Sequence, residues 1–263
     1  MLRFFSKMRY KLAAENRIGK YLRYAVGEIL LVVIGILIAL QVNNWNQQRK
    51  DNLSELEVLN GLQKEFSSNL DALNNSINQD QQIVNGCFEI INLIRSDELE
   101  EKSEKLDSLL QFVGSFGTFN AVTGVTDEII NSGKLHILKN DSLRVKLTQW
   151  SGRLTDAKED IEYRFDNYHQ NMMPYFTKNF PLANGDLTKK IANQLTGEVL
   201  PNIEEPSPFK TNFAHLNLME FESVTWHHKH NNDYVLYTNT GLKKEILTIL
   251  ELINSVISNR TDD

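Results

Sequence analysis

The most apolar stretch of the chain lies close to its N-terminus. Residues Ala25–Val42 are almost entirely hydrophobic; Tyr21 and Tyr24 precede them and Trp45 follows. Tyrosine and tryptophan rings favour the two headgroup levels of a bilayer. A helix from Tyr24 to Trp45 is roughly 31 Å long, and a bilayer hydrocarbon core is about 30 Å thick. The pattern predicts a transmembrane helix over residues 25–45, whose apolar run contacts lipid.

A heptad repeat follows and predicts a second helical stretch over residues 44–96. Only Gln63 and Asp80 interrupt two otherwise apolar columns of this repeat, which indicates a long helix with a coiled-coil-like seam. One column is Leu56, Gln63, Leu70, Ile77, Val84 and Ile91, and the other is Leu59, Phe66, Leu73, Asp80, Cys87 and Ile94.

Two more amphipathic patterns predict two further long helices. The first begins at Asp141, the expected N-cap directly after Asn140, and is expected to end before Pro174. The second begins near Asn217, which forms a capping-box pattern with Glu220, and Gly241 is expected to weaken or kink its middle.

These elements predict an all-α fold. Residues 46–263 should form an elongated antiparallel bundle of three long helices plus short helices. Antiparallel packing would place residues 97–140 at the end far from the membrane and the proline-rich residues 174–210 close to it. Within the first of these segments, Phe116 and Phe119 would either cap the bundle or form a binding tip.

Charge predicts the orientation of the transmembrane helix. Residues 1–24 hold seven Lys or Arg and a single Glu, whereas the whole chain carries a net charge of −6, so the remainder is strongly acidic. Basic flanks stay in the cytoplasm during insertion, which predicts a cytoplasmic N-terminus and an external bundle. No small-residue cleavage site follows the apolar run, which favours an uncleaved anchor over a signal peptide. The acidic bundle argues against nucleic-acid binding.

Two segments resemble an uncharacterised family of single-pass membrane proteins from Bacteroidetes-type Gram-negative bacteria. They are KYLRYAVGEILLVVIGILIALQVNNWNQQRK (Lys20–Lys50) and EIINSGKLHILKNDSLRVKLTQW (Glu128–Trp150). The resemblance implies a host with two membranes, and therefore an inner-membrane protein with a periplasmic bundle over residues 46–263. It implies no activity, so no catalytic residue or cofactor is transferred.

One cluster has the chemistry of a metal site. The segment WHHKHNND contains His227 and His230 on one helical face, and the expected topology brings His169 near them. Together with a carboxylate such as Glu57 or Glu65, these imidazoles would suit a transition metal. The spacing matches no recognised ligand motif, so a polar or hydrogen-bonded face is the alternative that we favour, with pH sensing as a third reading.

Glu28 is an acidic residue inside the apolar run. It lies about one turn past Tyr24, where it can reach the membrane surface or pair with Arg23. Alternatively it contributes to an interhelical contact, helped by the small residues Gly35 and Ala39, or to ion coupling in a transporter.

The sequence contains no convergent catalytic set and no sign of a bound cofactor. We therefore expect a non-enzymatic, membrane-anchored scaffold, interaction or accessory protein with an unidentified protein partner. A metal-binding protein and an accessory subunit of a membrane transporter are the alternatives. Because the other helices can cover the heptad seam, and because Gln63 and Asp80 weaken it, the soluble domain is expected to be monomeric.

Overall fold

The computed structural model describes residues 18–187, 198–199 and 201–261. The chain divides into two compact units, Met1–Glu57 and Val58–Asp263, and each is described by itself. The second unit begins twelve residues beyond the expected start of the bundle at residue 46. Residues 46–54 are helical, and all of them are exposed.

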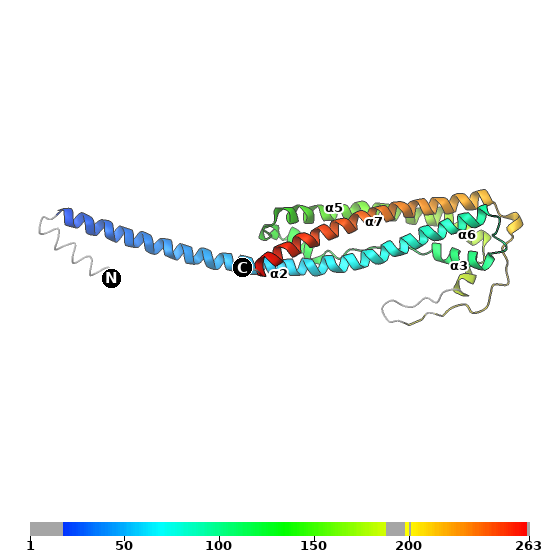
Figure 1. Cartoon of the computed structure of the whole chain (residues 1–263), viewed down its shortest axis with the longest axis horizontal. Helices are drawn as coiled ribbons and strands as arrows, with labels where there is room; N and C mark the ends of the chain where they lie inside the picture. Colours follow the sequence, from blue (N-terminus) through cyan, green and yellow to red (C-terminus); the bar gives the residue numbers. More distant parts are fainter. Residues whose placement is uncertain (1–17, 188–197, 200, 262–263) are drawn as a thin grey trace. The chain divides into compact units, whose positions relative to one another are not determined.

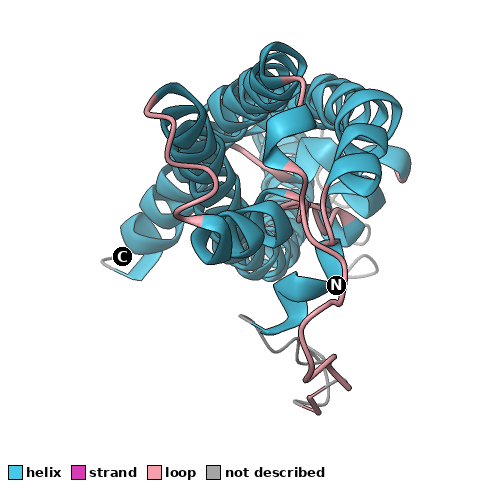
Figure 2. Cartoon of the chain, turned by 90° about the vertical axis from the view of Figure 1, so that its right-hand side faces the viewer, coloured by secondary structure: helices cyan, strands magenta, loops and turns pink. Residues whose placement is uncertain are grey.

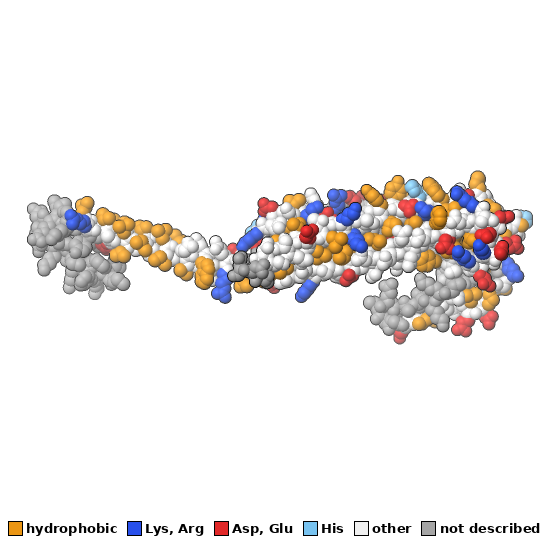
Figure 3. Space-filling model, viewed as in Figure 1, with side chains coloured by type: hydrophobic (Ala, Val, Ile, Leu, Met, Phe, Trp, Pro, Cys, Tyr) orange, Lys and Arg blue, Asp and Glu red, His pale blue; other side chains and the backbone are white. Residues whose placement is uncertain are grey.

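The first unit contains the beginning of helix α2 (Ile18–Arg95). From Ala25 onward this helix is long and apolar enough to cross a membrane. From Val26 to Val42 the Leu, Ile and Val side chains of this helix are exposed on every face. Hydrophobic side chains dominate the surface of this part of α2 (Figure 3). Trp45 is also exposed and Glu28 is half-buried, whereas the side chains of Tyr21 and Tyr24 lie outside the described residues.

The second unit is helical throughout its described elements (Figure 2), which confirms the all-α fold class. After the remainder of α2 come α3 (Ser103–Val113), α4 (Gly124–Asn131), η1 (Lys134–Ile137), α5 (Asp141–Asn167), η2 (Tyr168–Met172), α6 (Met173–Asn179), η3 (Leu182–Leu187), η4 (Phe213–His215) and α7 (Leu218–Thr261).

The predicted helix starts are confirmed. The N-cap of α5 is Asn140 instead of the expected Asp141, because the Asn140 side chain accepts a hydrogen bond from the backbone N–H of Leu143 at 2.9 Å. Asn217 precedes α7 and accepts one from the backbone N–H of Glu220 at 3.2 Å. Helix α7 continues through Gly241 as one element.

The predicted stop at Pro174 is wrong. The chain passes from α5 through the π-helical turn η2 directly into α6, and Pro174 lies in the first turn of α6. Proline interrupts a regular α-helical ladder of hydrogen bonds, and the irregular π-helical turn lies just before Pro174.

The direction of α5 also differs from the expectation. At the Val58 end of the unit, Leu59 and Leu62 of α2 share a core with Leu143 of α5 and Ile253 of α7. At the Arg95 end, Ile83 and Ile90 share a second core with Tyr168, Met172 and Phe221. Helix α5 therefore runs parallel to this part of α2, and α7 runs antiparallel to both (Figure 1). Residues 97–140 return along α2 instead of forming an end, and the turn at Pro174 lies at the Arg95 end.

The returning segment explains why α2 buries more than its predicted seam. A third column of α2 is buried as well, and two of its members are polar: Leu62, Asn69, Ser76, Ile83 and Ile90. Helix α3 and residues 114–126 cover this column. Gly86 permits the close approach of α3, because a Cβ atom there would lie only 2.8 Å from Val113 Cγ1.

Gly117 is a point of close approach between the returning segment and α2. A Cβ atom at this position would lie 2.7 Å from Asp80 Oδ1 and 2.8 Å from the Ser76 carbonyl oxygen, and backbone cannot move aside cheaply. We therefore expect Gly117→Ala to lower the free energy of unfolding by about 1–3 kcal/mol, as overpacking does.

Urea unfolding of the full chain in detergent, followed by circular dichroism, measures this change. Gly152→Ala is the matched control, because the space around Gly152 on α5 is open. It should leave stability unchanged or raise it by up to about 1 kcal/mol. A Gly117→Ala variant as stable as the parent would contradict the tight contact.

Candidate interaction surface

An ion pair lies in the interior of the second unit. Arg164 of α5 donates from Nη1 to Asp80 Oδ1 of α2 at 2.6 Å, and the two side chains are 1% and 0% exposed. Arg164 Nη2 donates to the Gly117 carbonyl at 2.6 Å, and the guanidinium lies 5.4 Å from the centre of the Phe116 ring. The pair thus connects α2, α5 and the returning segment.

Helix α7 completes this polar core. Asn239 donates to the second carboxylate oxygen of Asp80 at 3.1 Å, and Asn232 Oδ1 accepts from Arg164 at 3.1 Å. Burial raises the pKa of Asp80, and the Arg164 charge and hydrogen bonds oppose that shift. Several polar groups of this core are therefore paired with one another, whereas Arg164 Nε has no hydrogen-bond partner among the described residues.

His228 is the buried histidine of this core. Its Nε2 donates to the Val113 carbonyl at 3.0 Å. Burial lowers the pKa of His228 to about 4, and the nearby Arg164 charge acts in the same direction. The imidazole is therefore neutral at pH 7.

Polar side chains of α2 also fix the rest of the returning segment. Asn69 makes two hydrogen bonds of 2.8 Å with the backbone N–H and carbonyl of Val122. Glu65 accepts from the backbone N–H groups of Val125 and Thr126 at 2.6 and 3.3 Å, at the start of α4. The carboxylate considered as a metal ligand thus caps a helix instead.

The three candidate histidines are not brought to one point. His169 packs against Phe165, with ring centres 4.3 Å apart, and His230 stacks on Trp226 at 4.9 Å. His227 Nδ1 lies 3.1 Å from the Asn167 amide nitrogen. Within the described parts of the chain, no three His, Cys, Asp or Glu side chains are arranged to hold a metal ion.

Phe116 and Phe119 are packed residues. Phe116 contacts the rings of Phe165, Tyr168 and His228. Phe119 is buried in the core at the Val58 end. Of the two alternatives from the sequence, the structure therefore shows packing within the bundle and no aromatic binding tip.

The outward side of α7 carries several exposed aromatic residues. Trp226, Tyr234 and Tyr237 are 53%, 56% and 82% exposed, and Met219 is 78% exposed. Positions three and four residues apart share one side of a helix. On this rule they belong to one face, termed the α7 outer face: Met219, Ser223, Trp226, His230, Tyr234, Tyr237 and Gly241. None of these seven residues is Asp, Glu, Lys or Arg.

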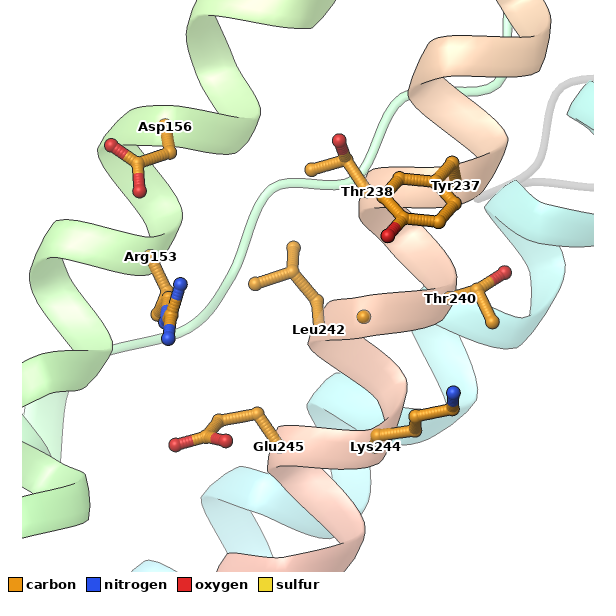
Figure 4. Close-up of a pocket in the computed structure, with 9 residues that line it drawn as sticks. Arg153, Asp156, Tyr237, Thr238, Thr240, Leu242, Lys244 and Glu245 are labelled. Carbon is orange, nitrogen blue, oxygen red and sulfur yellow. The ribbon is translucent and has the colours of Figure 1, made fainter.

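A shallow groove of about 420 Å³ between α5 and α7 adjoins this face (Figure 4). Leu242 and Glu245 extend from α7 toward α5, and Arg153 and Asp156 line the opposite side. Tyr237 and Gly241 belong both to the groove and to the α7 outer face. The groove extends the exposed surface, and Thr238, which lines it, donates its hydroxyl to the Asp160 carboxylate of α5 at 2.6 Å.

Our sequence analysis missed the α7 outer face because it followed only the apolar side that faces the core. That side is buried as predicted, for example at Phe221, Leu242 and Ile249. The signal available in the sequence was the spacing of Trp226, His230 and Tyr234, four residues apart.

A family model described as a family of unknown function, DUF6090, matches residues 28–167, which is more than half of the chain. The chain belongs to the DUF6090 family. The DUF6090 match includes Asp80, Gly117 and Arg164 and ends before α7. Comparisons with curated proteins and with solved structures found no match.

The pKa of His228 predicts acid sensitivity. The pKa is about 4 in the folded chain and near 6.5 in the unfolded chain, so protonation favours unfolding. The stability contributed by neutral His228 is complete above pH 6.5 and is lost as the pH falls toward 4. The shift corresponds to a loss of about 3 kcal/mol.

Unfolding free energies measured between pH 7.5 and 4 test this loss. His228→Gln should flatten the pH dependence, whereas the exposed-site control His169→Gln should retain it. An unchanged pH dependence in His228→Gln would show that other groups cause the acid sensitivity.

Proposed function

We propose that this chain is a membrane-anchored helical bundle that acts without catalysis, as a scaffold or interaction protein. In this proposal it contacts another protein molecule through the α7 outer face. The observation that carries the proposal is the gathering of exposed aromatic side chains on a face without charges. Aromatic residues are enriched and charges depleted at the centres of protein interfaces.

The pairing of the buried polar side chains with one another supports a role without catalysis. Asp80, Arg164 and His228 are side-chain types that occur in active sites, and all three are buried. Their partners are other groups of the bundle, and Glu65 is likewise occupied at the start of α4. These groups stabilise the fold and are screened from a substrate in solution.

The proposed location rests on the first unit and on charge. A helix whose apolar side chains are exposed on all faces is unfavourable in water and suits the lipid interior. With seven basic residues before it, we place the N-terminus in the cytoplasm and the bundle outside. The resemblance to proteins of Gram-negative bacteria makes the compartment a periplasm and the membrane the inner one.

Protease accessibility tests the orientation. Protease added to intact spheroplasts should digest a tag at the C-terminus and leave an N-terminal tag protected. If the C-terminal tag is digested only after lysis, the orientation is the reverse.

Site-specific photo-crosslinking tests the function. A photoreactive phenylalanine analogue replaces Tyr234 or Tyr237 in the full chain, in cells. Both positions should give discrete protein adducts, because they lie at the centre of the proposed contact.

Tyr163 and Phe88 are the matched controls. They are exposed aromatics, 63% and 55%, on α5 and α2. Their substitution should give few adducts. Absence of adducts at Tyr234 and Tyr237, or equal yields at all four positions, would overturn the assignment of the α7 outer face.

A further inference from the structure

An open turn of α7 at Gly241 forms part of the groove between α5 and α7. A Cβ atom placed on Gly241 would meet no heavy atom within 4 Å, so the space above this turn is free. Tyr237 lies about one turn before Gly241 and Lys244 about one turn after it, and all three line the groove of about 420 Å³. A side chain of another molecule therefore has room to enter the surface next to the α7 outer face.

Charged side chains beside the α7 outer face are paired within the chain. Glu222 forms an ion pair with Arg95 of α2, and Lys229 forms one with Asp233 at 2.7 Å. Because these charges are compensated by their own neighbours, they contribute little to the attraction of a charged partner.

The groove differs from these positions in its free charges. In the part of the chain that the structure describes, three of its charged side chains have no ion-pair partner: Arg153 and Asp156 of α5, and Lys244 of α7. The remaining one, Glu245, is paired with Lys146 at 3.1 Å. Arg153 and Lys244 lie on opposite sides of the groove (Figure 4). Two positive charges and one negative charge are thus left uncompensated.

We infer that the groove binds an acidic segment of the partner protein. An apolar side chain of this segment enters above Gly241 beside the Tyr237 ring, and neighbouring carboxylates pair with Arg153 and Lys244. The inference rests on the proposed function and gives the chemistry of the partner at one end of the same surface. Arginine and lysine form charge-assisted hydrogen bonds with carboxylates, and complementary charge selects the partner of an interface. Asp156 opposes an acidic segment and should weaken its binding.

Charge variants of the groove test the inference in the full chain, in cells. The photoreactive phenylalanine analogue at Tyr234 is the reporter, because Tyr234 belongs to the α7 outer face and does not line the groove. Arg153→Gln and Lys244→Gln should each lower the yield of the protein adduct about twofold to fivefold, as expected for the loss of one exposed ion pair. Asp156→Asn should raise the yield, because it removes a carboxylate that repels the segment.

Lys158→Gln and Glu162→Gln are the matched controls. These two residues pair with each other on the surface of α5, at 75% and 62% exposure, and neither lines the groove. Both controls should leave the adduct yield unchanged. Equal yields in the groove variants and the controls would overturn the inference, and so would a higher yield with Arg153→Gln or Lys244→Gln.

Filling the open turn is an independent test. Gly241→Leu should retain the helical circular dichroism, because the site is open and leucine has the higher helix propensity. It should lower the adduct yield more than either charge variant. Gly152→Leu is the control, since the space around Gly152 on α5 is also open and this residue does not line the groove. A yield that Gly241→Leu leaves unchanged would show that no side chain enters the groove.

Peptide binding to the purified full chain in detergent tests the class of the ligand. Three short fluorescent peptides share a central leucine and differ in its neighbours, which are glutamate, glutamine or lysine. Fluorescence anisotropy should show the tightest binding for the glutamate peptide, and this binding should weaken as salt is added. Tighter binding of the lysine peptide, equal binding of all three or no binding of any would overturn the acidic class.

The two proposals fail separately. Adducts at Tyr234 that respond to none of the groove variants leave the proposed function in place and exclude the groove as the acidic-segment site. Absence of adducts at Tyr234 and Tyr237 removes both.

Discussion

Arg164 and Asp80 form an ion pair almost completely removed from water in the interior of the second unit. Burying two charges costs several kcal/mol for each ion, and the pair is tolerated only where further hydrogen bonds satisfy the remaining donors and acceptors. Gly117, Asn232 and Asn239 supply three such bonds, and among the described residues Arg164 Nε is left without a hydrogen-bond partner. Gly117 lies in the returning segment, and Asn232 and Asn239 lie in α7. The requirement to satisfy one buried charge pair therefore fixes the relative positions of α2, α5, α7 and the returning segment.

The predictable part of the fold consists of features with a local cause. The apolar run, the heptad seam and the helix starts near Asp141 and Asn217 each depend on neighbours within a few residues, and the sequence was sufficient for them. The direction of α5 was not predictable in this way. It depends on hydrogen bonds between the side chains of Glu65 and Asn69 and the backbone of residues 122–126. Such bonds leave no periodic pattern in the sequence from which they could be predicted. Asp80 interrupted the predicted seam, yet it lies at the centre of the packing.

The histidine-rich segment shows how helical geometry separates chemically similar residues. His228 faces the polar core, His227 faces α5 through Asn167, and His230 lies on the outer face beside Trp226. A cluster in sequence is therefore dispersed around one helix. The same rotation collects Trp226, Tyr234 and Tyr237 on the outside, where they are exposed in the described part of the chain. The buried polar groups thus stabilise the fold. The α7 outer face presents aromatic side chains on the surface of the bundle.

A double-mutant cycle on the ion pair tests the central claim that it organises the bundle. Asp80→Ala, Arg164→Ala and the double variant are unfolded with urea in the full chain. Each single change should cost about 3–5 kcal/mol, because it leaves a buried charge without its partner. The double variant should cost well below the sum of the two, since neither charge then remains. Single losses below about 1 kcal/mol that add without coupling would show that the pair contributes little, and that the bundle is held by its apolar cores alone.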